Sequence, residues 1–274
     1  MSFKREFDPE DRISHLSDDV LISILSHLPM RVAATTSLLS RRWGNVWTFL
    51  PRLEFDASNT ILKIKNQTLG SNRTLSSKSL RDFIDSEKVR FVNMVNHFVE
   101  LYSLPVTEEF RICFDLNRRH KQDIDKWVKL CPRSLGLPSY ILLTSLVLKC
   151  IDVSDDVIEN FVSNSPFLEC LCVQPPTLVH VRVVGPSLHL RSLEISGCSS
   201  LKSLQLHATN LLSFKYFGPE IEIPFENVPN LTALCIKDYA YPPPILKLPR
   251  VLTFFPQLHK LSLAIDDVKI SWKN

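Results

Sequence analysis

A short apolar pattern, Leu-x-x-Leu-x-Leu, recurs through the second half of the chain and limits its fold more than any other feature. The steps between the copies are 25, 22, 21, 20 and 27 residues, and the copies begin at Leu143, Leu168, Leu190, Leu211, Leu231 and Leu258. Such a period predicts one short strand per repeat, with successive strands stacked in parallel as a solenoid. Related copies at residues 178–183 and 201–206 are expected on the opposite wall.

The segments between the strands indicate how compact each repeat is. Residues 154–166 read as a helix, with Ser154 as its cap and Asp155 and Asp156 in the first turn. Fourteen of the 18 prolines lie between Pro132 and Pro256. Because proline costs about 3 kcal/mol inside a helix, the later turns are expected to contain little helix.

Residues that alternate with the inward leucines are expected on the open, concave face of the repeats. We treat them as candidates for binding a target protein. Their mixed charges do not identify a ligand, and a strand face that only contacts solvent would show the same pattern. These candidates are Val147, Lys149, Cys172, Gln174, Glu194, Ser196, Lys215, Phe217, Cys235, Lys237 and Ser262.

Residues 11–47, DRISHLSDDVLISILSHLPMRVAATTSLLSRRWGNVW, predict three short amphipathic helices. Ser17 is placed to cap the first helix, and Pro29 ends it because the residue before a proline avoids the helical region. Ser40 is placed to cap the third, whose apolar stripe is Trp43, Val46, Trp47 and Leu50. Chains below about 40 residues rarely bury a core of their own. Part of this apolar surface is therefore expected to contact another part of the chain or a partner.

The order of residues in this segment is more specific than its periodicity. The succession I-S-x-L, two acids, V-L-x-x-I-L-S-x-L-P, A-x-x-T-S-x-L-S-R-R-W and V-W resembles the F-box of plant proteins. That resemblance implies docking on the Skp-type adaptor of a cullin-based (SCF) ubiquitin ligase. The adaptor-binding residues it suggests are Leu16, Leu21, Ile24, Leu25, Leu28, Pro29, Leu38 and Trp47.

For the F-box we expect two sides with different roles. The side that carries Trp43 is expected to be buried within the chain. The side that carries Leu21, Leu25 and Leu28 is expected to stay exposed as an apolar patch in the isolated subunit.

The whole arrangement resembles plant F-box/leucine-rich-repeat proteins of the F-box/FBD/LRR type. It predicts an F-box at residues 11–51, a connecting helix and first irregular repeats at 52–136, and leucine-rich repeats at 137–274. The FBD is expected to be largely absent, since only its start would fit before residue 274. We therefore expect the edge of the last repeat strand, at residues 258–263, to be exposed.

Composition excludes several other classes of protein. The net charge of +3 predicts no nucleic-acid partner, and no stretch approaches the roughly 20 apolar residues of a membrane span. The charged first residues do not read as a signal peptide, and seven scattered cysteines indicate free thiols in an intracellular protein of the cytoplasm or nucleus. No histidine or cysteine spacing indicates a metal, a cofactor or a catalytic centre.

The sequence thus predicts a non-catalytic, substrate-recognition subunit of an SCF ubiquitin ligase, with an unknown target protein. The alternative is a non-degradative interaction or scaffold protein that uses its repeat face. A third hypothesis, nucleic-acid binding by the basic residues 63–78 and 118–121, lacks the interleaved aromatic residues of a base-stacking surface.

Overall fold

The computed structural model describes residues 13, 16–57, 77–101, 107–130, 143–184, 189–223, 225–238, 257–265 and 268–273. The chain divides into two compact units, one that runs to Pro51 and one that begins at Arg52. Residues 63–76 of the predicted basic segment 63–78 lie outside the described residues. Residues 136 and 137, where the repeats were expected to begin, also lie outside them.

Four short elements form the first unit: α1 (Asp18–Ser26), α2 (Met30–Thr35), η2 (Thr36–Leu38) and η3 (Trp43–Phe49). Pro29 separates α1 from α2, and its carbonyl accepts the N–H groups of Val32 and Ala33 at 2.8 and 3.0 Å. The predicted third helix is a 3₁₀ helix that begins after Arg42, so Ser40 does not cap it. Its predicted stripe is nevertheless correct, since Trp43, Val46, Trp47 and Leu50 are all buried.

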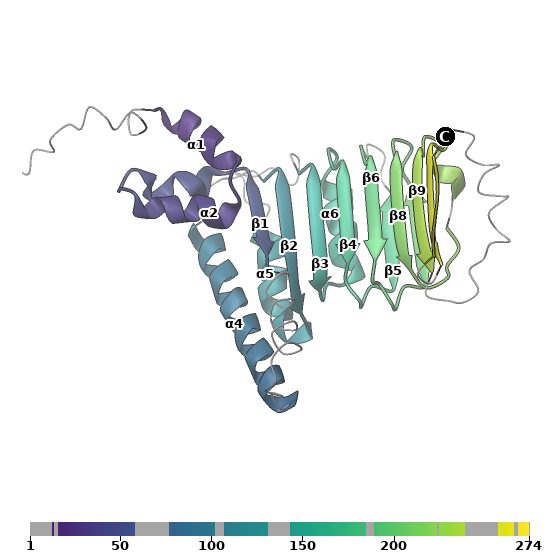
Figure 1. The fold of residues 1–274 in the computed structure, drawn as a ribbon, viewed down its shortest axis with the longest axis horizontal. Helices are drawn as coiled ribbons and strands as arrows, with labels where there is room; N and C mark the ends of the chain where they lie inside the picture. The colour runs from purple at the N-terminus through teal and green to yellow at the C-terminus, as the bar shows by residue number, and fades with distance from the viewer. Residues whose placement is uncertain are drawn as a thin grey trace, which may run out of the picture. The chain divides into compact units, whose positions relative to one another are not determined.

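The second unit is built on a nine-stranded sheet with the order β1-β2-β3-β4-β6-β8-β9-β10-β11 (Figure 1). All neighbouring strands are parallel except β10 and β11. The strands are β1 (Arg52–Asp56), β2 (Glu109–Leu116), β3 (Ser145–Ile151), β4 (Cys170–Gln174), β6 (Ser192–Ser196), β8 (Ser213–Gly218), β9 (Ala233–Asp238), β10 (Lys260–Ile265) and β11 (Val268–Lys273).

All six predicted repeat strands are present, and each begins two residues after the first leucine of its pattern. Their second apolar positions stand in one cross-strand row and are all buried: Leu146, Leu171, Leu193, Phe214, Leu234 and Leu261. The mostly parallel sheet with one strand per repeat is consistent with a repeat solenoid.

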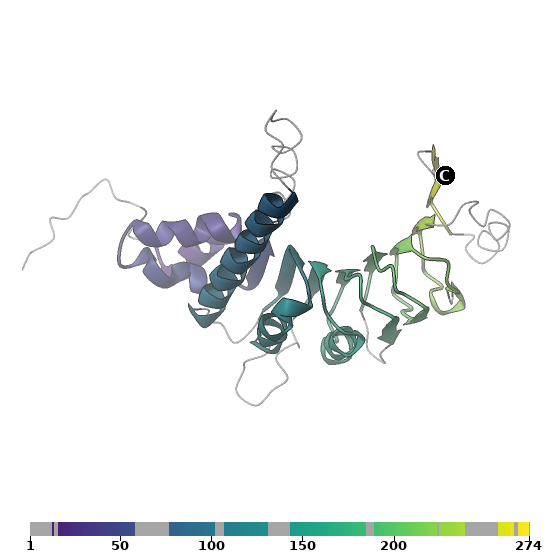
Figure 2. The same cartoon turned by 90° about the horizontal axis from the view of Figure 1, so that it is seen from below.

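A second layer covers the inner side of this sheet. The predicted return helix is α6 (Asp155–Asn164), and the two additional strand patterns form β5 (His180–Val184) and β7 (Ser203–His207), which pair in parallel. Figure 2 shows α5 and α6 on the same side of the main sheet. Among the described later turns only η6 (Phe225–Asn227) is helical, as the prolines predicted.

Two helices cover the first strands. In α4 (Ser77–Leu101), Phe91 stacks on Phe114 of β2 at 4.5 Å between ring centroids. In α5 (Lys121–Leu130), which follows η4 (Arg118–His120), Trp127 donates its indole N–H to Asn96 of α4 at 2.7 Å. Asn96 in turn donates to Asp123 at 2.9 Å, so a buried aromatic and an amide join α4 to α5.

The C-terminal end of the sheet differs from the expectation. Strand β11 folds back antiparallel on β10, and its register pairs Leu261 with Trp272 and Leu263 with Ile270. The prediction of an exposed edge at residues 258–263 is therefore wrong. The physical reason is that the alternating residues 268–273 satisfy the backbone groups of β10 as an additional strand.

Candidate functional site

Helix α1 of the first unit shows which side of its apolar arc turns inward. Leu21 and Leu25 are buried, whereas Val20 and Ile24, which lie four residues apart on the same helix, are exposed. Helix α1 contacts α2 and η3, which hold Met30, Ala33, Trp43 and Trp47 in the buried core of this unit. The small unit can therefore bury one edge of a wide apolar arc, and the other edge faces solvent.

This arrangement corrects the expected exposed patch. Leu21 and Leu25 do not stay exposed, and Leu28 is only half-buried. The prediction that Trp43 packs inside the chain is confirmed. Of the residues suggested for adaptor binding, Trp47 is also buried, Leu16 is half-buried, and Ile24, Pro29 and Leu38 are exposed.

The exposed apolar residues gather unevenly in the molecule. Among the described residues, twelve large apolar side chains are exposed, and seven of them belong to the first unit: Ile13, Val20, Ile24, Val32, Leu38, Leu39 and Phe49. Only Ile24 and Leu38 were among the predicted adaptor-binding residues, and the other five were not predicted from the sequence. The available signal was the excess of apolar residues over what so short a segment can bury.

One polar contact fixes the start of α1 against the segment before η3. The Arg42 guanidinium donates to Asp18 Oδ1 at 3.0 Å and also to the carbonyl of Leu16. Asp18 and Asp19 stand in the positive first turn of α1, as predicted, but the Ser17 side chain makes no capping hydrogen bond. Arg42 therefore performs part of the positioning that the sequence assigned to Ser17.

The open face of the sheet is defined here by the outward rows of side chains on β1–β10. One row passes through Arg111, Val147, Cys172, Glu194, Lys215, Cys235 and Ser262, which are paired strand by strand. The next row contains Asp56, Cys113, Lys149 and Gln174 at one end and Ser196, Phe217 and Lys237 at the other. The structure thus brings all the predicted target-binding residues onto one face.

Those candidates are not equally accessible. Val147, Cys172, Ser196 and Ser262 are buried, which corrects the expectation that they present themselves to a partner. All four are small or medium side chains. The remaining candidates are half-buried or exposed: Lys149, Gln174, Glu194, Lys215, Phe217, Cys235 and Lys237.

Glu194 is the centre of a charged network on this face. Its carboxylate lies 3.4 Å from Lys149 Nζ and 3.5 Å from Lys215 Nζ. Burial alone would raise the pKa of Glu194, but the two ammonium groups outweigh it and hold the pKa below its usual value. Burial, reinforced by Glu194, raises the pKa of the Cys172 thiol to about 12, so this cysteine is a neutral packing residue.

A second network occupies the β1–β2 end of the open face. The Arg111 guanidinium donates to Asp56 at 2.8 Å and lies 3.6 Å from Glu54. The hydrogen bond to Asp56 is the largest cause that raises the pKa of Arg111. Two carboxylates therefore hold the Arg111 guanidinium at this end of the face.

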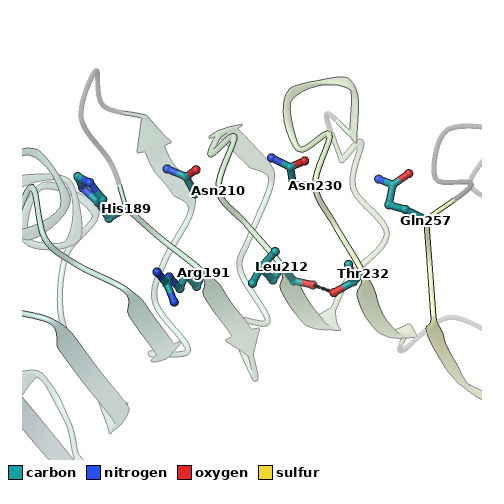
Figure 3. A pocket seen from close by; sticks show the side chains of 7 residues that line it. All are labelled: His189, Arg191, Asn210, Leu212, Asn230, Thr232 and Gln257. Carbon is teal, nitrogen blue, oxygen red and sulfur yellow. Dashed lines mark hydrogen bonds between the residues drawn. The ribbon is translucent and has the colours of Figure 1, made fainter.

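A shallow groove of about 740 Å³ lies at the edge of the sheet where the strands begin (Figure 3). Figure 3 shows its upper row, His189, Asn210, Asn230 and Gln257, at equivalent positions of successive repeats. Asn230 donates to the Thr209 carbonyl at 2.7 Å, and Gln257 donates to that of Pro229. These amides tie each repeat to the one before it, so we assign the row a structural role.

Within the described ranges, no group of three or more His, Cys, Asp or Glu side chains is arranged to hold a metal ion. None of the helices in those ranges combines the length and the apolar character needed to cross a membrane.

Comparison with known families and proteins identifies both units. Residues 126–271 match the family described as "At1g61320/AtMIF1, LRR domain", and residues 13–55 match the F-box domain. The putative F-box/LRR-repeat protein At4g15060 of Arabidopsis thaliana is 26% identical over 96% of this chain and 67% of its own length.

Two further Arabidopsis thaliana proteins show the same relationship. The F-box/FBD/LRR-repeat protein At4g00160 is 28% identical over 84% of this chain and 47% of its own length. The F-box protein At5g03100 is 31% identical over 71% of this chain and 66% of its own length. The chain thus spans about half to two thirds of the length of these curated relatives.

Proposed function

The chain belongs to the plant F-box/leucine-rich-repeat proteins, and we propose that it is the substrate-recognition subunit of an SCF E3 ubiquitin ligase. In this proposal the F-box docks on a Skp-type adaptor and, through it, on a cullin complex. The repeats present a target protein. The chain itself supplies proximity between target and ligase, while other subunits carry the chemistry.

The observation that carries this proposal is the apolar surface of the F-box unit. Seven large apolar side chains are exposed on a short segment, where an ordinary soluble surface would carry them singly. Leu38 is the most exposed of them at 87% of its surface, and Ile24 of α1 is exposed at 43%. Such residues are suited to act as the buried anchors of a protein interface.

A revised set of docking residues follows from burial. We retain Ile24, Pro29 and Leu38 as direct adaptor contacts and add Val20 and Leu39. Leu21, Leu25 and Trp47 are assigned to the core that holds these contacts in place. Leu16 and Leu28 stay as contacts at the margin, since both are half-buried.

The proposal is tested by titrating a purified Skp-type adaptor into the full chain by calorimetry. Ile24→Asp and Leu38→Asp place a charge on the docking surface, and each is expected to cost about 2 kcal/mol or more of binding free energy. Leu212→Asp is the matched control, because Leu212 lies in the repeat unit and its exposed fraction of 42% is close to the 43% of Ile24. Adaptor binding that is absent, or equal for Ile24→Asp, Leu38→Asp and Leu212→Asp, would falsify the docking role.

The same two variants, expressed in cells, separate the ligase subunit from a non-degradative scaffold. A scaffold that uses only its repeat face has no requirement for an apolar F-box surface. For such a protein Ile24→Asp and Leu38→Asp would leave partner binding in cells unchanged and would not alter ubiquitination of co-purified proteins.

A further inference from the structure

The charges on the open face of the sheet are sorted by sign along the repeats. Its β1–β2 end holds the acids Glu54, Asp56 and Glu109 together with the cations Arg52 and Arg111. At the other end, the described outward positions of β8, β9 and β10 include Lys215, Lys237 and Lys260 and no acidic residue. The face is therefore mixed at one end and basic at the other.

The three lysines lie on neighbouring strands and are all exposed. Lys215 of β8 is paired in register with Cys235 of β9, and Lys237 of β9 with Phe217 of β8. Glu194 is the nearest carboxylate of the network on this face, and it is already shared by Lys149 and Lys215. It therefore neutralises at most one of its two lysines, and the β8–β10 end keeps a net positive charge.

An apolar element lies among these lysines. Phe217 is half-buried between its register partners Ser196 and Lys237, and Cys235 is half-buried beside Lys215. An aromatic ring flanked by ammonium groups is suited to a segment that carries both carboxylates and an apolar side chain.

From these positions we propose that the β8–β10 end of the open face binds an acidic, partly apolar segment of the target protein. This inference rests on the proposed function and names the chemistry of the target. Lys215 on β8 and Lys260 on β10 lie two strands apart, about 10 Å, and are offset by two residues, about 7 Å, along the strands, so they are separated by about 12 Å. An extended segment that crosses the strands at an angle rises about 3.3 Å per residue, so acids three to four residues apart match these two lysines.

The direct test uses a short fluorescein-labelled peptide that repeats Glu-Phe-Ser, with fluorescence anisotropy measured on the full chain. The comparison peptide replaces each glutamate by glutamine. We expect the glutamate peptide to bind more tightly, and its affinity to fall as salt increases, because exposed charges are screened. Equal binding of the two peptides, or no binding of either, overturns the proposal.

A charge reversal at one lysine locates the site. Lys237→Glu is expected to weaken peptide binding by roughly fivefold to tenfold, since it replaces an attraction by a repulsion. Lys202→Glu is the matched control, because Lys202 is equally an exposed lysine but precedes β7 on the other layer. Equal affinities of the two variants contradict the site, provided that both melt at the wild-type temperature.

Two more measurements separate this inference from its alternatives. The first is a competition in which a single-stranded oligonucleotide or unlabelled peptide displaces the labelled peptide. If the oligonucleotide acts at the lower concentration, the acidic-segment proposal is overturned in favour of a nucleic-acid ligand. Ile24→Asp should leave peptide binding unchanged, and Lys237→Glu should leave adaptor binding unchanged. Failure of the F-box proposal and failure of the acidic-segment proposal are thus visible in different variants.

Discussion

The F-box unit and the repeat unit expose opposite kinds of surface. The F-box carries seven of the twelve exposed large apolar side chains among the described residues, whereas the repeat strands turn their leucines inward and present charges. A repeat buries its apolar row against the next repeat, so its outward positions are free to be polar. The F-box is too small to do the same, and its surplus apolar surface is suited to a partner.

Leu25→Ala is expected to destabilise the F-box unit by about 2–5 kcal/mol, because it removes a fully buried side chain and leaves a cavity. Ile24→Ala should change stability by about 0.5 kcal/mol or less, since Ile24 faces solvent. Chemical denaturation followed by tryptophan fluorescence measures both, because Trp43 and Trp47 lie in the core of this unit. Equal costs for the two variants would show that the assignment of sides in α1 is wrong.

In the repeat unit a carboxylate holds a helix against the following strand, whereas apolar contacts hold the helices of the F-box together. Asp155 of α6 accepts the backbone N–H groups of Val179 at 3.0 Å and His180 at 2.9 Å. Asp155→Ala is expected to cost about 1–3 kcal/mol, because it leaves two backbone donors without an acceptor. The matched control is Asp156→Ala in the same helical turn. If the melting temperature falls equally for both variants, the two hydrogen bonds of Asp155 contribute no more than the charge of any acid in the first turn.

A smaller gain is expected at Gly44 in η3. A Cβ atom added there meets nothing within 4 Å, and the residue is not among those with positive φ. Gly44→Ala is therefore expected to stabilise the F-box unit by about 0.4–1 kcal/mol, chiefly by reducing the freedom of the unfolded chain. A lower denaturation midpoint than wild type would contradict this expectation.

The smallest effect concerns the Glu194 network and its dependence on pH. Because Lys149 and Lys215 hold the pKa of folded Glu194 below its usual value, ionised Glu194 stabilises the fold above about pH 4.3, the unfolded value. This contribution, at most about 1 kcal/mol for so exposed a network, is lost as the pH falls through the lower folded pKa.

Glu194→Gln removes that contribution at neutral pH and should flatten the dependence of stability on pH between neutral and acid. Exposed Glu169→Gln is the charge-matched control. Denaturation curves collected across this range, with an unaltered slope for Glu194→Gln, would count against the network.

The sequence predicted most of the repeat unit, since its signals are local. The steps between leucines located six strands, and the caps and prolines located α6 and the helix-poor turns. The candidate sites were predicted less completely. All the target-binding candidates lie on one face, but four of them are buried, and the row positions alone did not reveal this.

Local sequence patterns were enough to predict the order of the elements, the F-box and the inward rows of the repeats, because periodicity and caps act within a few residues. Tertiary structure decided which edge of the apolar arc in α1 turns inward, because only packing against α2 and η3 separates Leu25 from Ile24. It also decided that β11 covers β10 and that lysines of three strands share one end of the open face. Those outcomes depend on residues far apart in the chain, which local patterns do not connect.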